Sequence, residues 1–161
     1  MPAPLQKLNR KRWLILGACG MLVSPAFVGG ATVRTWADAG LDFNANASWL
    51  LCIAPIDNAT SDIGSFGLIN LFQPVLSTNR SINGLAFTIL STGDVSFSGA
   101  GELTIGTGGI NNQSTTGVKT ISTALTLAAA QSFTNNGSLT LSSPVDNCGL
   151  NLTLAGTGAK G

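Results

Sequence analysis

A short apolar–Thr–apolar unit recurs along the second half of the chain, and it limits the folds that the chain can adopt. The unit occupies residues 103–105, 125–127, 139–141 and 152–154, so its starts are spaced by 22, 14 and 13 residues. Alternation of apolar and polar residues over such short runs is typical of β-strands that bury one side. Gly, Asn and Ser fill the intervals and favour turns, so the sequence predicts short strands joined by tight corners.

Loose repetition of short strands with Asn and Gly corners favours an all-β fold, a parallel β-helix (β-solenoid) in which each coil pairs with its neighbours. The apolar residues then stack into one continuous core, while Thr, Ser and Asn face water. An antiparallel sandwich or barrel is the competing fold, because Asn83-Gly84 and Asn136-Gly137 suit two-residue hairpins. The side chains expected to point inward are Phe87, Ile89, Leu103, Ile105, Leu125, Leu127, Phe133, Leu139 and Leu141.

The first 31 residues have the character of a secretory signal. Residues 1–12 carry four basic side chains and no acid, and the uncharged, mostly apolar run 13–31 follows. A basic segment, an apolar segment and small residues before a cleavage site define such signals. Gly29 and Ala31 predict cleavage between Ala31 and Thr32, so we expect the mature chain to be extracellular or at the outer cell surface.

Cys19 allows a second interpretation of this segment. Residues 16–19 have the form of a bacterial lipoprotein cleavage box, which would make Cys19 the lipid-bearing first residue of a small secreted lipoprotein. Only residues 13–18 separate the basic segment from Cys19, which is short for an apolar segment of a signal. We therefore favour cleavage after Ala31, and we expect membrane contact only through the export signal.

The composition of residues 32–161 argues against several functional classes. This part carries four basic and seven acidic side chains, a net charge of −3, and no basic cluster, so we expect no nucleic-acid partner. The chain has no His, so a Ser or Cys nucleophile lacks its usual base and a zinc site is disfavoured. We expect neither a cofactor nor a metal.

Acidic residues are the remaining candidates for chemistry, as in a carbohydrate-active β-helix enzyme. Acid–base catalysis needs two carboxylates in one cleft. The candidate pairs are Asp38/Asp42, Asp57/Asp62 and Asp94/Glu102. Because Asp among Asn, Gly and Ser is more often a turn former, we expect no catalytic residue. Calcium-binding repeats need an Asp that residues 106–114 lack, which leaves Asp57 and Asp62 as the candidate calcium ligands.

Residues 32–75 differ in character from the rest of the mature chain. Trp36 and Trp49 both fall here, among Asp, Asn and Pro residues with no clear period. A stack of strands exposes an edge at each end that must be covered, so we expect an irregular N-terminal cap at 32–75 and β-helix repeats at 76–161. Cys52 and Cys148 fall in these different regions, and a disulfide between them is not favoured because distant coils do not touch.

The order of these elements resembles the autotransporter-associated β-strand repeat proteins of Gram-negative bacteria. The matching residues are Trp36, Trp49, Ala54-Pro55, Asp62, Phe66-Gly67, 84–89, 103–105, 108–112 and 125–137. The resemblance covers roughly residues 32–161 and implies a long, right-handed β-helical passenger exported to the cell surface. Such proteins often end in an outer-membrane β-barrel or a sorting segment, neither of which this sequence contains, so we expect the repeats to be truncated at the C-terminus.

Together these features predict a non-enzymatic structural module of the bacterial cell surface, an autotransporter-type passenger segment with a role in adhesion. The expected partners are host or matrix glycans and proteins, or further coils of the same kind. The alternatives are a fragment of a carbohydrate-active β-helix enzyme and a small secreted lipoprotein.

Overall fold

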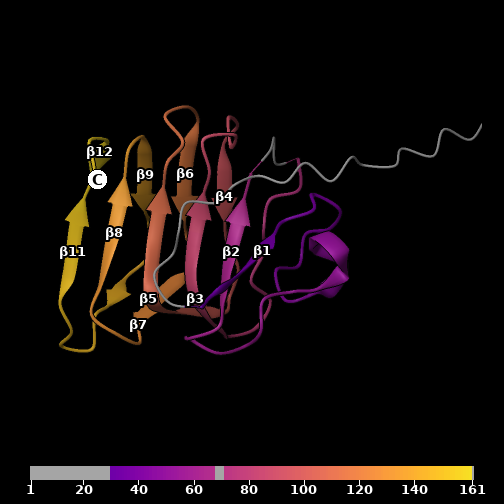
Figure 1. Ribbon diagram of the computed structural model, residues 1–161, viewed down its shortest axis with the longest axis horizontal. Helices are drawn as coiled ribbons and strands as arrows, with labels where there is room; N and C mark the ends of the chain where they lie inside the picture. Colours follow the sequence, from indigo (N-terminus) through magenta and orange to yellow (C-terminus); the bar gives the residue numbers. More distant parts are fainter. Residues whose placement is uncertain (1–29, 68–70, 161) are drawn as a thin grey trace, which may run out of the picture.

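A computed structural model describes residues 30–67 and 71–160 of the chain (Figure 1). This part of the protein is all-β, a solenoid of about four turns in which successive coils pair in parallel. Cys19 and most of the predicted signal lie outside the described residues.

Short strands make up most of the described chain. Two 3-10 helices, η1 (Asn46–Ser48) and η2 (Leu50–Cys52), lie between the first two strands. The strands are β1 (Thr32–Thr35), β2 (Asp62–Phe66), β3 (Arg80–Phe87), β4 (Val95–Phe97), β5 (Glu102–Asn112), β6 (Val118–Ile121), β7 (Ala124–Leu127), β8 (Gln131–Asn135), β9 (Ser138–Leu141), β10 (Val145–Asp146), β11 (Leu152–Ala155) and β12 (Ala159–Lys160).

Each coil has three faces, which we name as they are seen in Figure 1. The front face consists of β1, β2, the second halves of β3 and β5, β8 and β11. The lower face consists of the first halves of β3 and β5, with β7 and β10. The rear face consists of β4, β6, β9 and β12. β3 and β5 therefore bend around the corner between the lower and front faces.

The coil is right-handed, because the chain advances from right to left in Figure 1 while it rises along the front and passes over the top to the rear. All strand pairs of the described chain are parallel. This confirms the predicted β-helix and excludes the antiparallel alternative. Asn83-Gly84 lies within β3, and Asn136-Gly137 connects strands of two different sheets, so neither dipeptide forms a hairpin.

The four apolar–Thr–apolar units are spread over three faces, which explains their irregular spacing. Leu103 and Leu125 start two units and stack directly on the lower face, 22 residues apart. Leu139 starts the third unit on the rear face, and Leu152 starts the fourth on the front face. The coil is therefore the structural repeat. The short apolar–Thr–apolar unit marks strands whose apolar side chains point inward, on whichever face the strand lies.

Most of the side chains expected to point inward do lie in the core, and Ile89 does not. Those that are at most 7% exposed are Phe87, Leu103, Ile105, Leu125, Leu127, Phe133 and Leu139. Leu141 is partly buried against them. Ile89 is 70% exposed, because β3 ends at Phe87 and the chain then turns, with the Ser91 N–H donating to the Thr88 carbonyl (2.9 Å). The alternation of β3 therefore cannot be extended to Ile89.

Residues 32–75 are irregular only in part. β1 and β2 are solenoid strands that pair with each other, and β2 also pairs with β3. Every residue of β2 is buried, so this strand lacks the apolar–polar alternation that marks a half-exposed strand. The irregular part is the excursion 36–61, which contains both 3-10 helices, and the first solenoid strand of the described residues begins at Thr32.

Candidate association site at the open end of the solenoid

The acidic residues considered for catalysis serve as hydrogen-bond acceptors within turns and between coils. Asp57 accepts from the N–H of Ser81 (2.7 Å), and Asp94 accepts from the N–H of Val118 (2.8 Å) in the next coil. The other acceptor–donor groups are Asp38 with Leu71 and Phe72, Asp42 with Asn44 and Ser77, and Glu102 with Thr126. These contacts favour the structural interpretation of the carboxylates.

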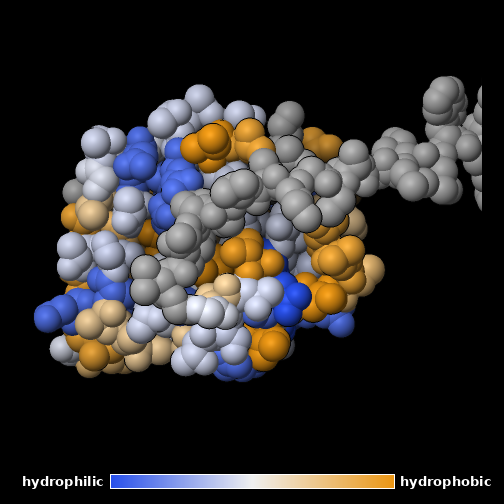
Figure 2. All heavy atoms as spheres, viewed as in Figure 1, coloured by the Kyte–Doolittle hydropathy of each residue, from blue (hydrophilic) through white to orange (hydrophobic). Residues whose placement is uncertain are grey.

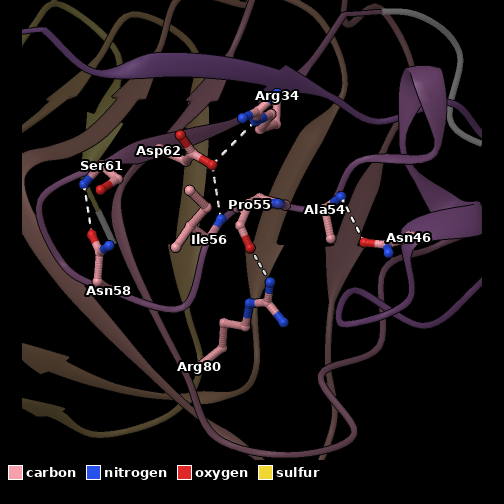
Figure 3. Close-up of polar contacts among 9 residues, drawn as sticks. All are labelled: Arg34, Asn46, Ala54, Pro55, Ile56, Asn58, Ser61, Asp62 and Arg80. Atoms are coloured by element: carbon pink, nitrogen blue, oxygen red, sulfur yellow. Dashed lines mark hydrogen bonds and ion pairs between the residues drawn. The ribbon is translucent and has the colours of Figure 1, made fainter.

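Asp62, the remaining member of the candidate pairs, fastens the excursion to the first two coils (Figure 3). Asp62 is 1% exposed. Its Oδ2 accepts from Arg34 Nε on β1 (3.1 Å) and from the N–H of Ile56 in the excursion (2.8 Å). The buried carboxylate is thus neutralised and hydrogen-bonded, as a buried charge requires.

Three further contacts tie the excursion in place (Figure 3). The Arg80 guanidinium donates to the Pro55 carbonyl, which joins the excursion to β3. Within the excursion, Asn46 Oδ1 accepts from the N–H of Ala54 (3.1 Å). Asn58 Oδ1 accepts from the N–H of Ser61 (2.8 Å) in the turn that leads into β2.

The excursion closes the N-terminal end of the core with aromatic side chains. Trp36, Phe43 and Trp49 are 5%, 0% and 1% exposed. Trp36 and Trp49 pack edge to face at 5.2 Å, and Phe43 packs against Phe97 at 4.9 Å. The Trp49 Nε1–H donates to the Phe43 carbonyl (2.8 Å), so its polar group is satisfied. We call this the closed end.

The outer surface of the excursion is apolar as well. Leu50, Leu51 and Ile53 are 53%, 81% and 43% exposed, and hydrophobic side chains gather over the 3-10 helices at the right of Figure 2. Leu51 and Cys52 both have left-handed backbone angles (φ 61° and 55°), which non-glycine residues rarely adopt.

The opposite end of the core is covered much less. β10, β11 and β12 are the last strands of their sheets in the described chain. Leu154 stands opposite the buried Phe133, yet it is 53% exposed. Four other apolar side chains that pack against the core near this end are only partly buried, and they are Leu141, Val145, Leu150 and Leu152. We call these five residues the open end, and they form the candidate association site.

Lys119 is a buried cation that the sequence analysis missed. It is 0% exposed and lies on β6 between Val95 and Leu139. Its Nζ donates to the carbonyls of Ser91 (2.8 Å), Gly93 (2.6 Å) and Thr116 (3.1 Å). Burial lowers the pKa of Lys119, and the nearby Asp94 carboxylate opposes this shift. Alignment of the sequence by coil rather than by the short unit would have placed Lys119 at an inward position.

Asn112 and Asn135 form a buried amide pair that the sequence analysis also missed. They occupy one inward column of the front face, which reads Phe66, Phe87, Asn112 and Asn135 from the closed end towards the open end. Asn112 Nδ2 donates to Asn135 Oδ1 (2.7 Å), and both residues are at most 3% exposed. Stacked side-chain amides of this kind form hydrogen bonds with one another along a parallel stack, so that their buried polar groups have partners.

Cys52 and Cys148 are both free and exposed. Cys52 belongs to η2 in the excursion, and Cys148 lies in the turn before β11. Desolvation and the neighbouring Asp146 carboxylate raise the pKa of the Cys148 thiol. The two thiols therefore belong to opposite ends of the coil stack.

Comparison with family models, with curated proteins and with solved structures gives no match for this chain. Within residues 30–67 and 71–160, no helix is long and apolar enough to cross a membrane, and no group of three or more His, Cys, Asp or Glu residues could hold a metal ion. The functional interpretation therefore depends on the coil stack and its two ends.

Proposed function

We propose that this chain is a non-enzymatic structural module of the bacterial cell surface, a segment of an autotransporter-type β-helical passenger with a role in adhesion. The observation that carries the proposal is the polarity of the coil stack. Its N-terminal end is closed by Trp36, Phe43 and Trp49, and its C-terminal end presents an apolar layer. This polarity suits a rod that starts at the closed end and is extended by further coils.

The position of the first strand supports export. β1 begins at Thr32, the residue that follows the predicted cleavage site. Its Arg34 makes the ion pair with buried Asp62, and β1 pairs with β2 along its whole length. Cleavage after Ala31 therefore leaves the first coil intact.

The rear face offers a surface suited to glycans or proteins. Ser96, Thr120 and Thr140 are paired neighbours on β4, β6 and β9, and Ser122 and Ser142 continue the hydroxyl-bearing surface, with their Oγ atoms 2.9 Å apart. Uncharged hydroxyl groups donate and accept hydrogen bonds at little desolvation cost compared with charges. The face therefore supports an adhesive role.

Fractionation of bacterial cells that express the chain tests the export. We expect the protein outside the cytoplasm, with a mature N-terminus at Thr32 by mass spectrometry and with cleavage by protease added to intact cells. A lipid-bearing Cys19 supports the lipoprotein instead, and retention in the cytoplasm contradicts the proposal. Turnover on a glycan panel that is lost in Asp57→Asn or Asp62→Asn establishes the enzyme alternative.

A further inference from the structure

The chain contains two Asn-Gly pairs, and the structure surrounds them in different ways. Asn83-Gly84 lies within β3, whereas Asn136-Gly137 forms the corner between β8 and β9. The amide nitrogen of a Gly can attack the side chain of the Asn before it, because Gly has no side chain to hinder the approach. The two pairs have the same reactive groups, so their surroundings decide which of them reacts.

Asn83 is held in place and shielded from water. It is 5% exposed, and its Oδ1 accepts from Thr107 Oγ1 (3.2 Å) and from the N–H of Gly108 (2.9 Å). Gly84 belongs to a strand that pairs with β2 on one side and with β5 on the other. Attack on Asn83 therefore requires that a central strand first opens, which costs a large part of the global stability.

Asn136 has much more freedom. Its side chain is exposed, and within residues 30–67 and 71–160 its carboxamide has no hydrogen-bond partner. The N–H of Gly137 donates to Asn135 Oδ1 at 3.2 Å, the long limit of an ordinary hydrogen bond, so the attacking nitrogen is held weakly. Rotation of the Asn136 side chain towards this nitrogen breaks no strand pairing, and water reaches the corner.

We propose that Asn136 is a site of spontaneous deamidation with isoaspartate formation. The Gly137 nitrogen attacks Cγ of Asn136, a C–N bond forms, and the side-chain nitrogen leaves as ammonia with the proton of the Gly137 N–H. Water then opens the resulting succinimide at either carbonyl. The product is an aspartyl residue, or an isoaspartyl residue in which the main chain runs through Cγ. The site does not depend on the proposed function of the chain.

The isoaspartyl product lengthens the main chain at a closely packed corner. The Asn136 N–H donates to the Asn112 carbonyl of the preceding coil (2.9 Å), and a Cβ at Gly137 would collide with the carbonyl oxygen of Ser114. A longer link cannot keep both contacts, so the corner must move away from the preceding coil. The aspartyl product keeps the length of the main chain and adds a charge at an exposed position, so the isoaspartyl form should be the less stable one.

Peptide mapping by mass spectrometry of the purified protein, stored at neutral pH and sampled over weeks, tests the proposal. We expect the carboxylate to accumulate at Asn136 at least about tenfold faster than at Asn83. Part of the product should be a substrate for an isoaspartyl methyltransferase. In concentrated urea the two sites should react at similar rates, because no strand then shields Asn83.

Asn136→Gln is the matched variant, because its longer side chain has to close a larger ring while it remains exposed. It should melt as the wild type does and should lack the main acidic species on ion exchange. In the isoaspartyl fraction of the wild type, hydrogen exchange of residues 131–141 should be faster than before storage. An unreacted Asn136, equal rates at both sites in the folded protein, an aspartyl product alone, or an unchanged acidic species in Asn136→Gln overturns the proposal.

Discussion

The two ends of the described core differ in how far their apolar side chains are covered. At the closed end, Phe43 and Trp49 are at most 1% exposed. At the open end, Leu154 is 53% exposed although it stands in the same inward column as Phe133. A repeating coil provides a cover for each layer except the last, so closing an end requires residues that do not repeat. In the described chain, the excursion 36–61 supplies such residues at the N-terminal end.

The stack also changes along its length. Towards the closed end, Phe66 and Phe87 stack with their ring centroids 5.4 Å apart. Towards the open end, the same column continues with the Asn112–Asn135 amide pair. In this column, packing of apolar surface therefore provides the contacts near the closed end. Near the open end, hydrogen bonds between buried amides provide a larger part of the contacts.

The largest expected difference in stability loss is between an inward leucine in the middle of the coil stack and one at its open end. Leu127→Asp places an unpaired charge at a position that is 1% exposed, and we expect a loss of more than about 4 kcal/mol, enough to unfold the module. Leu154→Asp, at the open end, should cost less than about 1 kcal/mol. Thermal unfolding followed by circular dichroism measures both. An unchanged melting curve for Leu127→Asp would show that Leu127 is not a core residue.

Loss of an aromatic side chain at the closed end should have the next largest effect on stability. Trp49→Ala removes a buried indole and its hydrogen bond to the Phe43 carbonyl, and we expect a loss of about 3–5 kcal/mol in urea unfolding. Its neighbour Leu50 is 53% exposed, so Leu50→Ala should stay within about 0.5 kcal/mol of the wild type. Equal losses in both variants would mean that the excursion does not close the core through Trp49.

The amide pair should have a smaller effect. Asn112→Ala leaves the Asn135 carboxamide without its 2.7 Å partner, which should cost about 1–3 kcal/mol. The matched control is Asn111→Ala, because Asn111 Oδ1 is buried without a hydrogen-bond partner and its removal should be neutral or slightly stabilising. A larger loss for Asn111→Ala than for Asn112→Ala would contradict the amide stack.

The smallest effect is a pH dependence at Lys119, midway along the stack. Burial lowers its folded-state pKa below the ordinary value of 10.5, so the unfolded chain binds more protons than the folded chain between those two values. The stability contribution of Lys119 should therefore rise with pH in that window. The difference in melting temperature between the wild type and Lys119→Met should shift in favour of the wild type from neutral to alkaline pH. A flat or opposite trend would show that burial of the Lys119 ammonium does not destabilise the folded protein.

The inward positions were predictable wherever a strand has one buried and one exposed side. Leu103, Leu125 and Phe133 follow from local alternation alone. β2 was not predicted, since all five of its residues are buried, and Ile89 was misplaced because alternation does not show where a strand ends. Lys119 and Asn112 break the apolar pattern at inward positions, so only their coil neighbours reveal them.

The candidate association site was predictable only in outline. An open strand edge follows from any linear stack of coils, and the sequence places the irregular, aromatic residues in the N-terminal part. The corners that bring three faces together decide which apolar side chains lie at this end of the core, and these are Leu141, Val145, Leu150, Leu152 and Leu154. Such contacts span about one coil or more of sequence and carry no local signature.

By itself, the sequence determined that this chain forms short strands with tight corners, with apolar residues inward and hydroxyl groups outward, because side-chain alternation is a local property of the backbone. The tertiary structure decided the length of the coil, the face on which each strand lies, and which end of the core is closed. These features depend on contacts between residues that are distant in the chain, such as Arg34 with Asp62 or Trp49 with Trp36, and no periodic pattern encodes them.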